Sequence, residues 1–550
     1  MNSAWAATVI NRSTSVDGDR RLWVNSRWVQ CCVGLLLATG LIARLSPLFD
    51  VTGRLYWQFM SEDGYLMQTI ARNMAIGLGM STAHGTMPTN GVQPLATFFY
   101  AGLHALAGGA KLPAIAYVTV FSAAVSVAAA WFLRRLGQSL LRDLPFGNDI
   151  ATLAAALWFA SPLVMGHSMN GLETGVYYLA LMLALVYYFS LDLAAARPMT
   201  AGQRVLLGLL LGVAFLARND AVFFIAAVLL AHVLLGGTVA GGGWGRRVGD
   251  AVVAGGLSIV VASPWLIHNK LLFGSVVPIS GAAQSRGAPL GANLRMIPAN
   301  LLEALLLYVP IPRALEAAWP VVVASVALLV AVGWATWALV GQHDLRRRRF
   351  CIIALLFCAG IGGYYGLFFG APWFVSRYLS ALSPMLWLLL VTTAYLALAG
   401  LLRERRTFLN SGAAIVSVLL LWAAGLAAFH FVKQTSNGHK QVVDWVQKNV
   451  DERQWVGAVQ TGTLGYFHDR TINLDGKVNP TALRANIERG QVLTYVLDDT
   501  PINYLVDWVG IAGWATMTSE PRFGKAFSVV VKDEAANLAA LHRDQPVAAP

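Results

Sequence analysis

Apolar runs of about 20 residues recur along most of this chain, and short arginine-bearing loops separate many of them. One such run is long enough for an α-helix to cross the ~30 Å hydrocarbon core of a bilayer. Hydrophobic residues make up 57% of the 550 residues and charged residues only 12%, which excludes an ordinary soluble protein. A membrane β-barrel would show alternating polar and apolar residues instead. The sequence therefore predicts a polytopic α-helical membrane protein.

The apolar runs predict about eleven transmembrane helices. The arginine clusters between them, such as Arg134–Arg135 and Arg346–Arg349, all fall on one membrane face in this count. By the positive-inside rule that face is cytoplasmic, which places the N-terminus inside and the C-terminus outside. The expected spans are 29–49, 112–136, 151–167, 177–193, 205–216, 221–235, 251–267, 321–340, 352–369, 379–402 and 413–432.

The net charge of +12 invites a nucleic-acid partner, but its distribution argues against one. Residues 1–432 have a net charge of +13, whereas residues 433–550 have a net charge of −1. The basic excess therefore belongs to the loops of the membrane part, where it sets the topology. We expect membrane lipids as partners and no nucleic acid.

The composition changes after the last apolar run, and this change predicts three parts. Residues 1–28 form a cytoplasmic tail, 29–432 a transmembrane module, and 433–550 a small soluble α/β domain on the outer side. Within the last part, apolar residues at helical spacing predict a helix at 440–450. Runs of β-branched and aromatic residues predict strands at 455–460, 502–506 and 527–531.

The outer loop at 50–111 is the stretch where we expect the chemistry. It contains two adjacent acids, Glu62 and Asp63, at the start of a short amphipathic helix. Residues 96–106 are apolar but too short to cross a bilayer, and they predict an interfacial helix. Because charged groups are costly beside hydrocarbon, an acidic pair at the mouth of a span indicates function.

Polar side chains from several loops, including a second long loop at 271–318, meet at the predicted outer face. A carboxylate there can accept a proton from a hydroxyl group. Arginine or lysine can bind a lipid phosphate, and Asn, Gln and His can hydrogen-bond to sugars. The candidate residues are Glu62, Asp63, Tyr65, Arg72, His84, Asn90, Gln93, Glu173, Arg218, His268, Asn269, Lys270, Arg377 and Tyr378.

Structural alternatives remain open for these candidates. The acidic pair could cap the helix that follows it, and Asp220 could pair with the nearby Arg218. Lys270 and Arg377 could anchor the ends of spans among the lipid headgroups. The spacing of His, Cys, Asp and Glu demands no metal site, so the sequence predicts no definite cofactor and leaves a divalent cation as an alternative.

The acidic pair belongs to a longer motif, Glu62-Asp63-Gly64-Tyr65, followed by Ala71-Arg72-Asn73 and Gly77-x-Gly79. This motif, with the layout of spans and loops, resembles the GT-C superfamily of membrane glycosyltransferases. It is most similar to the actinobacterial terminal arabinofuranosyltransferase branch. That branch has two aspartates where this chain has Glu-Asp, so an arabinose donor does not follow.

Three further segments resemble the same group of proteins. In the membrane part these are Gly171-Leu172-Glu173-Thr174 and Ser376-Arg377-Tyr378. In the soluble part, Gly465-Tyr466-Phe467 with Asn473-Leu474-Asp475-Gly476 resembles a motif in the soluble tails of related membrane proteins.

The resemblance implies an inverting glycosyltransferase at the outer face of a bacterial inner membrane. The donor would be a polyprenyl-phosphate sugar, and the acceptor a cell-envelope glycan, a glycolipid or an exported protein. Asp63 would be the base, with Glu62 as its orienter or as the alternative base. Arg377 is the first choice for binding the donor phosphate, followed by Lys270 and Arg218, with Tyr378 beside them.

Two other functions remain as alternatives. A transporter or flippase for lipid-linked sugars would place ionisable groups and broken helices at the middle of the bilayer. A non-enzymatic scaffold that displays the outer domain would tolerate changes throughout the loop at 50–111.

Overall fold

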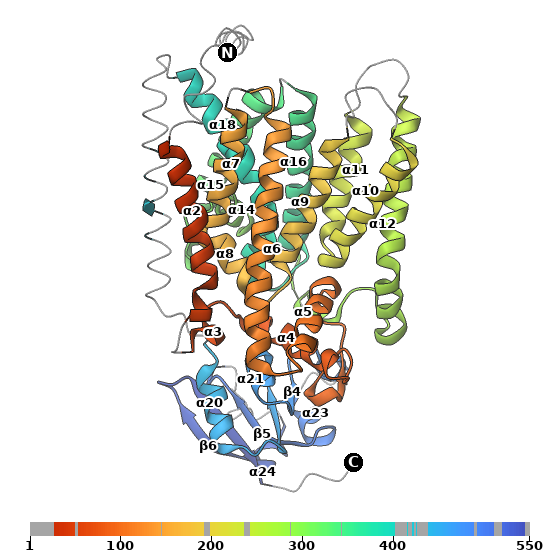
Figure 1. Cartoon of the computed structure of the whole chain (residues 1–550). Coiled ribbons are helices and arrows are strands. Elements are labelled where there is room, and N and C mark those ends of the chain that lie inside the picture. The colour runs from red at the N-terminus through yellow and green to blue at the C-terminus, as the bar shows by residue number, and fades with distance from the viewer. Residues whose placement is uncertain are drawn as a thin grey trace.

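Apolar helices run side by side in the computed structural model, and a small sheet domain covers one end of the bundle (Figure 1). The description covers residues 27–49, 53–144, 146–191, 199–235, 243–285, 288–342, 344–401 and 438–544 without 489–491 and 511–519, and a few positions between 415 and 425. The expected tail up to residue 26 and most of the expected span at 413–432 lie outside these residues.

Six helices in the described part of the chain are long and apolar enough to cross a membrane. A seventh span is formed if two helices joined by a 60° bend, α7 (Gly147–Ala160) and α8 (Pro162–Met169), count as one. The six include α2 (Arg27–Leu45), α6 (Lys111–Leu140), α12 (Trp244–Phe273), α15 (Trp319–Thr336), α16 (Leu345–Leu367) and α18 (Ser383–Leu401).

Three of the expected spans form helices that are shorter than a full crossing. These are α9 (Thr174–Ser190), α10 (Ala201–Ala217) and α11 (Ala221–Leu234). A 17-residue helix is only about 25 Å long, less than the ~30 Å of hydrocarbon. By length and composition, fewer full crossings are found in the described residues than the eleven expected for the whole chain, although every expected span before residue 402 is helical.

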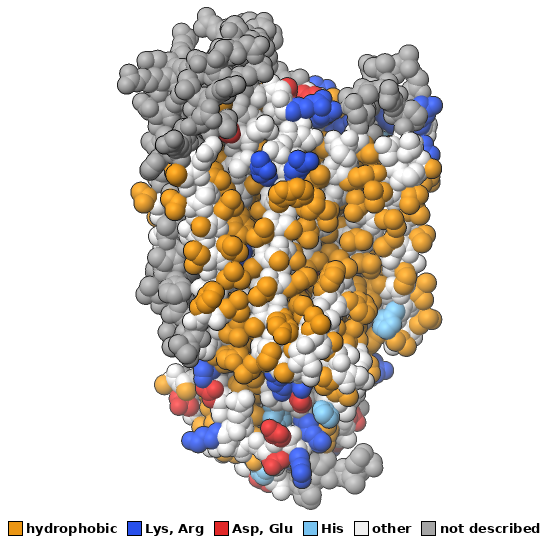
Figure 2. Space-filling model, in the orientation of Figure 1, with side chains coloured by type: hydrophobic (Ala, Val, Ile, Leu, Met, Phe, Trp, Pro, Cys, Tyr) orange, Lys and Arg blue, Asp and Glu red, His pale blue; other side chains and the backbone are white. Residues whose placement is uncertain are grey.

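Basic side chains gather at the end of the bundle that is remote from the sheet domain. Helix α6 begins at that domain, where Lys111 Nζ lies 2.8 Å from Asp469 Oδ1, and its 30 residues extend about 45 Å away from it. At the remote end, Arg347 pairs with Asp143 at 2.9 Å, and Arg349 donates a hydrogen bond to a backbone carbonyl. Figure 2 shows a broad apolar band between these basic groups and the charged surface of the sheet domain.

Short helices fill the junction between the bundle and the sheet domain. The expected amphipathic helix is α4 (Glu62–Ala75), and the expected interfacial helix is α5 (Pro94–Leu106). A two-stranded hairpin, β1 (Ser81–Thr82) and β2 (Met87–Pro88), lies between them in sequence. The second expected outer loop contains α13 (Ile279–Ser285) and α14 (Ile297–Leu306), and α17 (Val375–Leu379) precedes α18.

The soluble domain is a five-stranded mixed sheet in the order β4-β3-β5-β7-β6. Strands β3, β4 and β5 are parallel, and β6 and β7 add an antiparallel edge. The expected helix and three strands are present, whereas β4 and β7 were not expected from the sequence. The bounds are α20 (Lys440–Asn449), β3 (Trp455–Ala458), α21 (Gly462–Phe467), β4 (Thr471–Asn473), α22 (Pro480–Glu488), α23 (Val492–Asp498), β5 (Ile502–Asp507), α24 (Phe523–Ala526), β6 (Phe527–Asp533) and β7 (Leu538–Arg543).

The carboxyl ends of the three parallel strands face the membrane module. The chain after β3 contacts Glu62 through Gly462 N, and the chain after β4 brings Val478 into the core of the membrane helices. Asp507, the last residue of β5, accepts hydrogen bonds from Val459 N and Gln460 N at 2.8 and 3.0 Å. Loops at the carboxyl ends of parallel strands are the usual place for ligand sites in α/β sheets.

Candidate active site

The N-terminus of α4 directs its two acids to different surroundings. Ser61 caps the helix, because its side chain accepts a hydrogen bond from Gly64 N at 3.0 Å. Glu62 and Asp63 follow in the first turn, where the helix dipole favours negative charge. Because neighbouring residues on an α-helix point about 100° apart, the two carboxylates face different neighbours.

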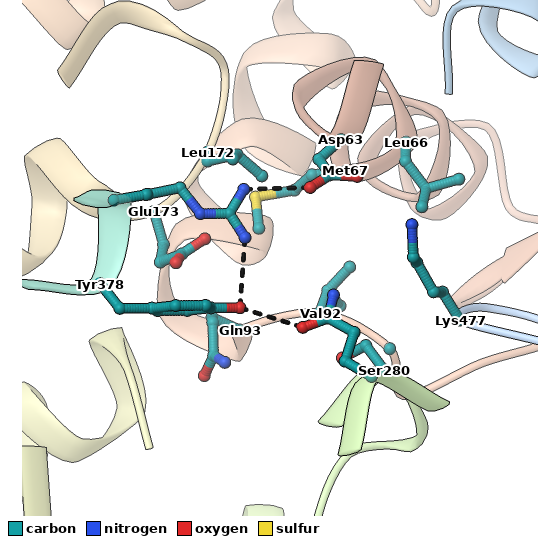
Figure 3. A pocket seen from close by; sticks show the side chains of 13 residues that line it. Asp63, Leu66, Met67, Val92, Gln93, Leu172, Glu173, Ser280, Tyr378 and Lys477 are labelled. Atoms are coloured by element: carbon teal, nitrogen blue, oxygen red, sulfur yellow. Dashed lines mark hydrogen bonds and ion pairs between the residues drawn. The ribbon is translucent and has the colours of Figure 1, made fainter. Parts of the chain in front are cut away.

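Asp63 faces a cavity at the junction. Its Oδ2 atom lies 3.0 Å from Arg377 Nη1. The Nη2 atom of Arg377 donates to the Tyr378 hydroxyl at 3.2 Å, and that hydroxyl donates to Gln284 Oε1 at 3.3 Å. Figure 3 shows this series of hydrogen bonds along the cavity wall. It holds the Asp63 carboxylate in one orientation, towards the cavity.

Contacts with Glu303 and Tyr365 hold the Ser376-Arg377-Tyr378 segment in position. Ser376 Oγ donates a hydrogen bond of 2.6 Å to Glu303 Oε2 on α14. The ring of Tyr378 stacks on that of Tyr365, with centroids 4.2 Å apart and an interplanar angle of 8°. Arg377 and Tyr378 are therefore positioned by packing and hydrogen bonds before any ligand binds, as a binding site requires.

The cavity has a volume of about 70 Å³. Among the described residues, the carboxylate of buried Glu173 makes no hydrogen bond or ion pair, and Glu173 lines this space. Gln93 also lines it and accepts a hydrogen bond from Asn219 N at 3.3 Å. The remaining lining residues are Leu66, Met67, Gly91, Val92, Leu172, Ser280, Gln284 and Lys477.

Five of the residues expected from the sequence therefore meet at the cavity. They are Asp63, Gln93, Glu173, Arg377 and Tyr378. They come from α4, the start of α5, the start of α9 and α17, which are more than 300 residues apart at the extremes.

Glu62 lies outside the cavity and joins the two parts of the molecule. Its carboxylate accepts hydrogen bonds from Gly462 N, Thr463 N and the Thr463 hydroxyl at the start of α21. A Cβ atom at position 462 would lie 1.8 Å from the backbone oxygen of Glu62, so only glycine permits this approach. Buried His439 lies beyond, with Nδ1 4.0 Å from Glu62 Oε2 and Nε2 3.2 Å from Asp507 Oδ1.

Four other candidates also have structural partners. Buried Arg218 pairs with Asp220, as the structural alternative predicted, and donates to the backbone oxygen of Tyr378 at 3.0 Å. Arg72 pairs with Asp469 of the soluble domain at 3.1 Å. The remaining two are Tyr65, whose hydroxyl donates to Tyr56 O, and Asn90, whose Oδ1 accepts from Ile279 N.

Four more candidates lie away from the cavity lining. His84 is exposed on the turn of the β1–β2 hairpin, in the left-handed conformation at φ 52°. His268 stacks on Trp265 within α12, with centroids 5.5 Å apart. Asn269 and exposed Lys270 donate to Val276 O and Gly274 O, in the segment that directly follows α12.

The cavity is poorly suited to a divalent cation. Within the described residues there is no group of three or more His, Cys, Asp or Glu side chains that could hold a metal ion. The two carboxylates of the cavity, Asp63 and Glu173, share it with two cations, Arg377 and Lys477. Divalent cations favour several oxygen ligands and an excess of negative charge. Metal dependence stays a prediction.

Lys477, Gln284 and Ser280 were not expected from the sequence to line the site. Lys477 directly follows the Asn473-Leu474-Asp475-Gly476 segment, so this motif is the sequence feature that could have led to it. Gln284 and Ser280 belong to α13, a seven-residue helix in the second outer loop, whose sequence has no distinguishing motif.

A family model described as "Domain of unknown function (DUF8728)" matches residues 427–540, which include the soluble domain. No curated protein sequence matches this chain. The match covers less than half of the chain and assigns no activity to it.

Solved membrane-protein structures resemble the whole chain. One is ArnT from Cupriavidus metallidurans bound to undecaprenyl phosphate, with a TM-score of 0.59 and 13% identity over 96% of this chain and 100% of that one. Another is the oligosaccharyltransferase AglB from Archaeoglobus fulgidus, in complex with an inhibitory peptide and a dolichol-phosphate. Its TM-score is 0.54 at 14% identity, and the match covers 92% of this chain and 73% of that one. At such identities the likeness concerns the fold, and it confirms the predicted fold class, a polytopic α-helical membrane protein with a small soluble domain.

Proposed function

We propose that this protein is an inverting glycosyltransferase that moves a sugar from a polyprenyl-phosphate donor to a hydroxyl group of a cell-envelope glycan, a glycolipid or an exported protein. The observation that carries the proposal is the cavity, in which Asp63 is held 3.0 Å from Arg377 beside Glu173. This pairing of acids and cations lies at the boundary between the apolar helices and the soluble domain. A lipid-linked substrate would present its phosphate at such a boundary.

The proposed reaction is a single displacement. The acceptor oxygen attacks the anomeric carbon as its proton passes to Asp63. The bond between the anomeric carbon and the phosphate oxygen breaks, and the phosphate leaves with the electron pair. Attack from the face opposite the leaving group inverts the anomeric configuration. A phosphate leaving group needs charge stabilisation more than protonation, and the Arg377 guanidinium can supply two parallel hydrogen bonds.

Binding of the phosphate would also change the partner of Asp63. In the structure, Arg377 donates to Asp63 and to Tyr378. A phosphate group offers Arg377 a stronger acceptor than one carboxylate oxygen. We propose that the donor phosphate accepts hydrogen bonds from this guanidinium in place of Asp63, which leaves Asp63 free to act as the base. Glu173, a second carboxylate in the same cavity, is the alternative base because Glu62 is engaged by α21.

Location and donor specificity belong to the proposal. The basic end of the bundle would face the cytoplasm, and the cavity would then lie at the outer face of the membrane. We propose that this membrane is a bacterial inner membrane. The solved structures of similar fold contain undecaprenyl phosphate or a dolichol-phosphate, and this supports a polyprenyl-phosphate donor. We leave the sugar open.

A transfer assay tests the proposal. Purified protein would receive radiolabelled polyprenyl-phosphate sugars and membrane-extracted acceptors, with and without a chelator. We expect Asp63→Asn to lower kcat by about 10²–10⁴-fold, the usual contribution of a general base. Glu62→Gln should retain far more activity, because Glu62 does not line the cavity. The chelator should have little effect.

Two outcomes would contradict the proposal. Wild-type transfer rates in Asp63→Asn would exclude Asp63 as the base, and loss in Glu173→Gln alone would assign that role to Glu173. Failure to transfer any sugar, together with movement of lipid-linked sugar across liposome membranes, would favour a flippase.

A further inference from the structure

The turn that follows β4 enters the membrane module. Its conformation is set locally: Asn473 Oδ1 accepts a hydrogen bond from Gly476 N at 3.0 Å, and Gly476 adopts a positive φ of 85°. Val478, at the end of this turn, is fully buried and packs in the hydrophobic core of the membrane helices rather than in that of the soluble domain. The turn is therefore part of the junction itself, held by apolar burial.

A close backbone contact fixes the position of Lys477 in this turn. A Cβ atom at Gly91 would lie 2.3 Å from the carbonyl oxygen of Lys477. Gly91 N donates to Thr89 Oγ1 at 3.1 Å, so the loop on the membrane side is also ordered. The main chain of Lys477 thus packs directly against the loop that leads into α5.

The side chain of Lys477 projects into the cavity. Figure 3 shows its amine on the side opposite Glu173 and Tyr378, with Leu66 and Val92 nearby. The side chain is 19% exposed, and Nζ lies 3.2 Å from Asp475 Oδ2. Burial disfavours the charged form, but Asp475, Asp63 and Glu62 outweigh it and raise the pKa of Lys477. The amine is therefore a cation at neutral pH.

The cations of the cavity differ in their engagement. The two terminal nitrogens of Arg377 donate to Asp63 and to the Tyr378 hydroxyl. Lys477 has an ion pair with Asp475, which does not line the cavity, and a compact ammonium group with three donors that can rotate. An anion entering the cavity would meet Lys477 without displacing a cavity carboxylate from its partner.

We propose that Lys477 binds the phosphate of the lipid-linked donor, so that the C-terminal domain supplies one wall of the active site. This inference rests on the proposed function for the identity of the phosphate carrier. It assigns a role in substrate binding to a domain that is matched only by a family of unknown function. It also explains why the turn after β4 is anchored among the membrane helices.

Lipid-binding measurements on the full chain test the inference. Binding of a short-chain polyprenyl phosphate and of the uncharged polyprenol would be compared for wild type, Lys477→Met, Lys477→Arg and a control, Lys532→Met. Lys532 is an exposed lysine of β6 that pairs with Glu534 at 3.1 Å. We expect Lys477→Met to weaken binding of the phosphate about 10–100-fold, as for loss of a charged hydrogen-bond donor. Lys477→Arg should retain part of the affinity, and Lys532→Met all of it.

Lysine footprinting of the wild-type protein provides a test that does not depend on the folding of a variant. Acetylation of Lys477 should be slowed by polyprenyl phosphate and not by polyprenol, whereas Lys532 should react equally in both. Equal acetylation of Lys477 with and without the phosphate would overturn the inference, as would wild-type phosphate affinity in Lys477→Met. Equal weakening of polyprenol binding would also overturn it, because the effect would then be on the lipid chain.

The outcomes separate this inference from the proposed function. Sugar transfer at wild-type rate and KM by Lys477→Met would refute the role of Lys477 and leave the glycosyltransferase assignment intact. Phosphate binding that depends on Lys477 in a protein that transfers no sugar would refute the glycosyltransferase assignment and leave the binding site intact.

Discussion

At the residue scale, two adjacent carboxylates have different partners. Asp63 lines the cavity and is held by Arg377, whereas Glu62 accepts three hydrogen bonds from the start of α21. The sequence motif presents them as a pair, yet Glu62 connects the two domains. His439 extends that connection, because it lies between Glu62 and Asp507.

The pH dependence of this connection follows from His439. Burial disfavours its charged form, but Glu62 and Asp507 outweigh burial and raise its pKa above the ordinary value of about 6.5. The charged form therefore stabilises docking fully below about pH 6.5, and this stabilisation is lost as the pH rises through the raised pKa. We expect amide hydrogen exchange in Gly462–Phe467 to gain protection as the pH falls, after correction for intrinsic rates.

The matched variant for this experiment is His439→Gln, which cannot become charged. It should show no extra loss of protection as the pH rises. If wild type and His439→Gln change in parallel across pH 6–9, the coupling to His439 is absent.

At the element scale, α21 and α4 approach so closely that their contact depends on one glycine. A methyl group on Gly462 would meet the backbone of α4 at 1.8 Å, and backbone atoms cannot move aside as a flexible side chain can. Gly465 lies on the same six-residue helix, but its nearest neighbour would be Thr471 at 3.7 Å, an ordinary contact.

This difference predicts that a glycine-to-alanine substitution has a large effect at position 462 and little effect at position 465. Gly462→Ala should separate α21 from α4, expose the domain junction to limited proteolysis and lower transfer activity about 10-fold or more, because a loss of 1.4 kcal/mol in positioning suffices. Gly465→Ala should leave both proteolysis and activity close to wild type. Equal protease resistance in the two variants would show that the junction does not need this close approach.

At the scale of the whole molecule, the two ends of the bundle differ in charge. Arginine side chains gather at one end, and the soluble domain with the cavity lies at the other (Figures 1 and 2). By the positive-inside rule, we expect the arginine end to face the cytoplasm. The proposed reaction needs this orientation, because the acceptors are outside the cell membrane.

Labelling of single cysteines tests the orientation. In a background without the four native cysteines, Arg142→Cys lies at the arginine end and Glu534→Cys lies on the soluble domain, and both positions are exposed. A membrane-impermeant maleimide added to intact spheroplasts should label Glu534→Cys and not Arg142→Cys. The reverse pattern would place the cavity in the cytoplasm and contradict the proposed location.

The sequence by itself determined the fold class, because the apolar runs are long and charge is rare within them. It also located the helices and several strands, since periodicity and capping residues are local signals. The sequence could not say which apolar runs form helices long enough to cross the bilayer. Helices α9, α10 and α11 are apolar but short, and packing against neighbouring helices rather than composition determines their position. The resemblance to the arabinofuranosyltransferase branch stays a prediction.

Only the tertiary structure decided which candidates share the site. Asp63 and Arg377 are 314 positions apart, and Lys477 reaches them from a different domain. Contacts at such separation depend on how the helices pack and on how the soluble domain docks, and no local pattern records either. The same packing placed Glu62 and Asp63 in separate surroundings, because a helix turns about 100° from one residue to the next.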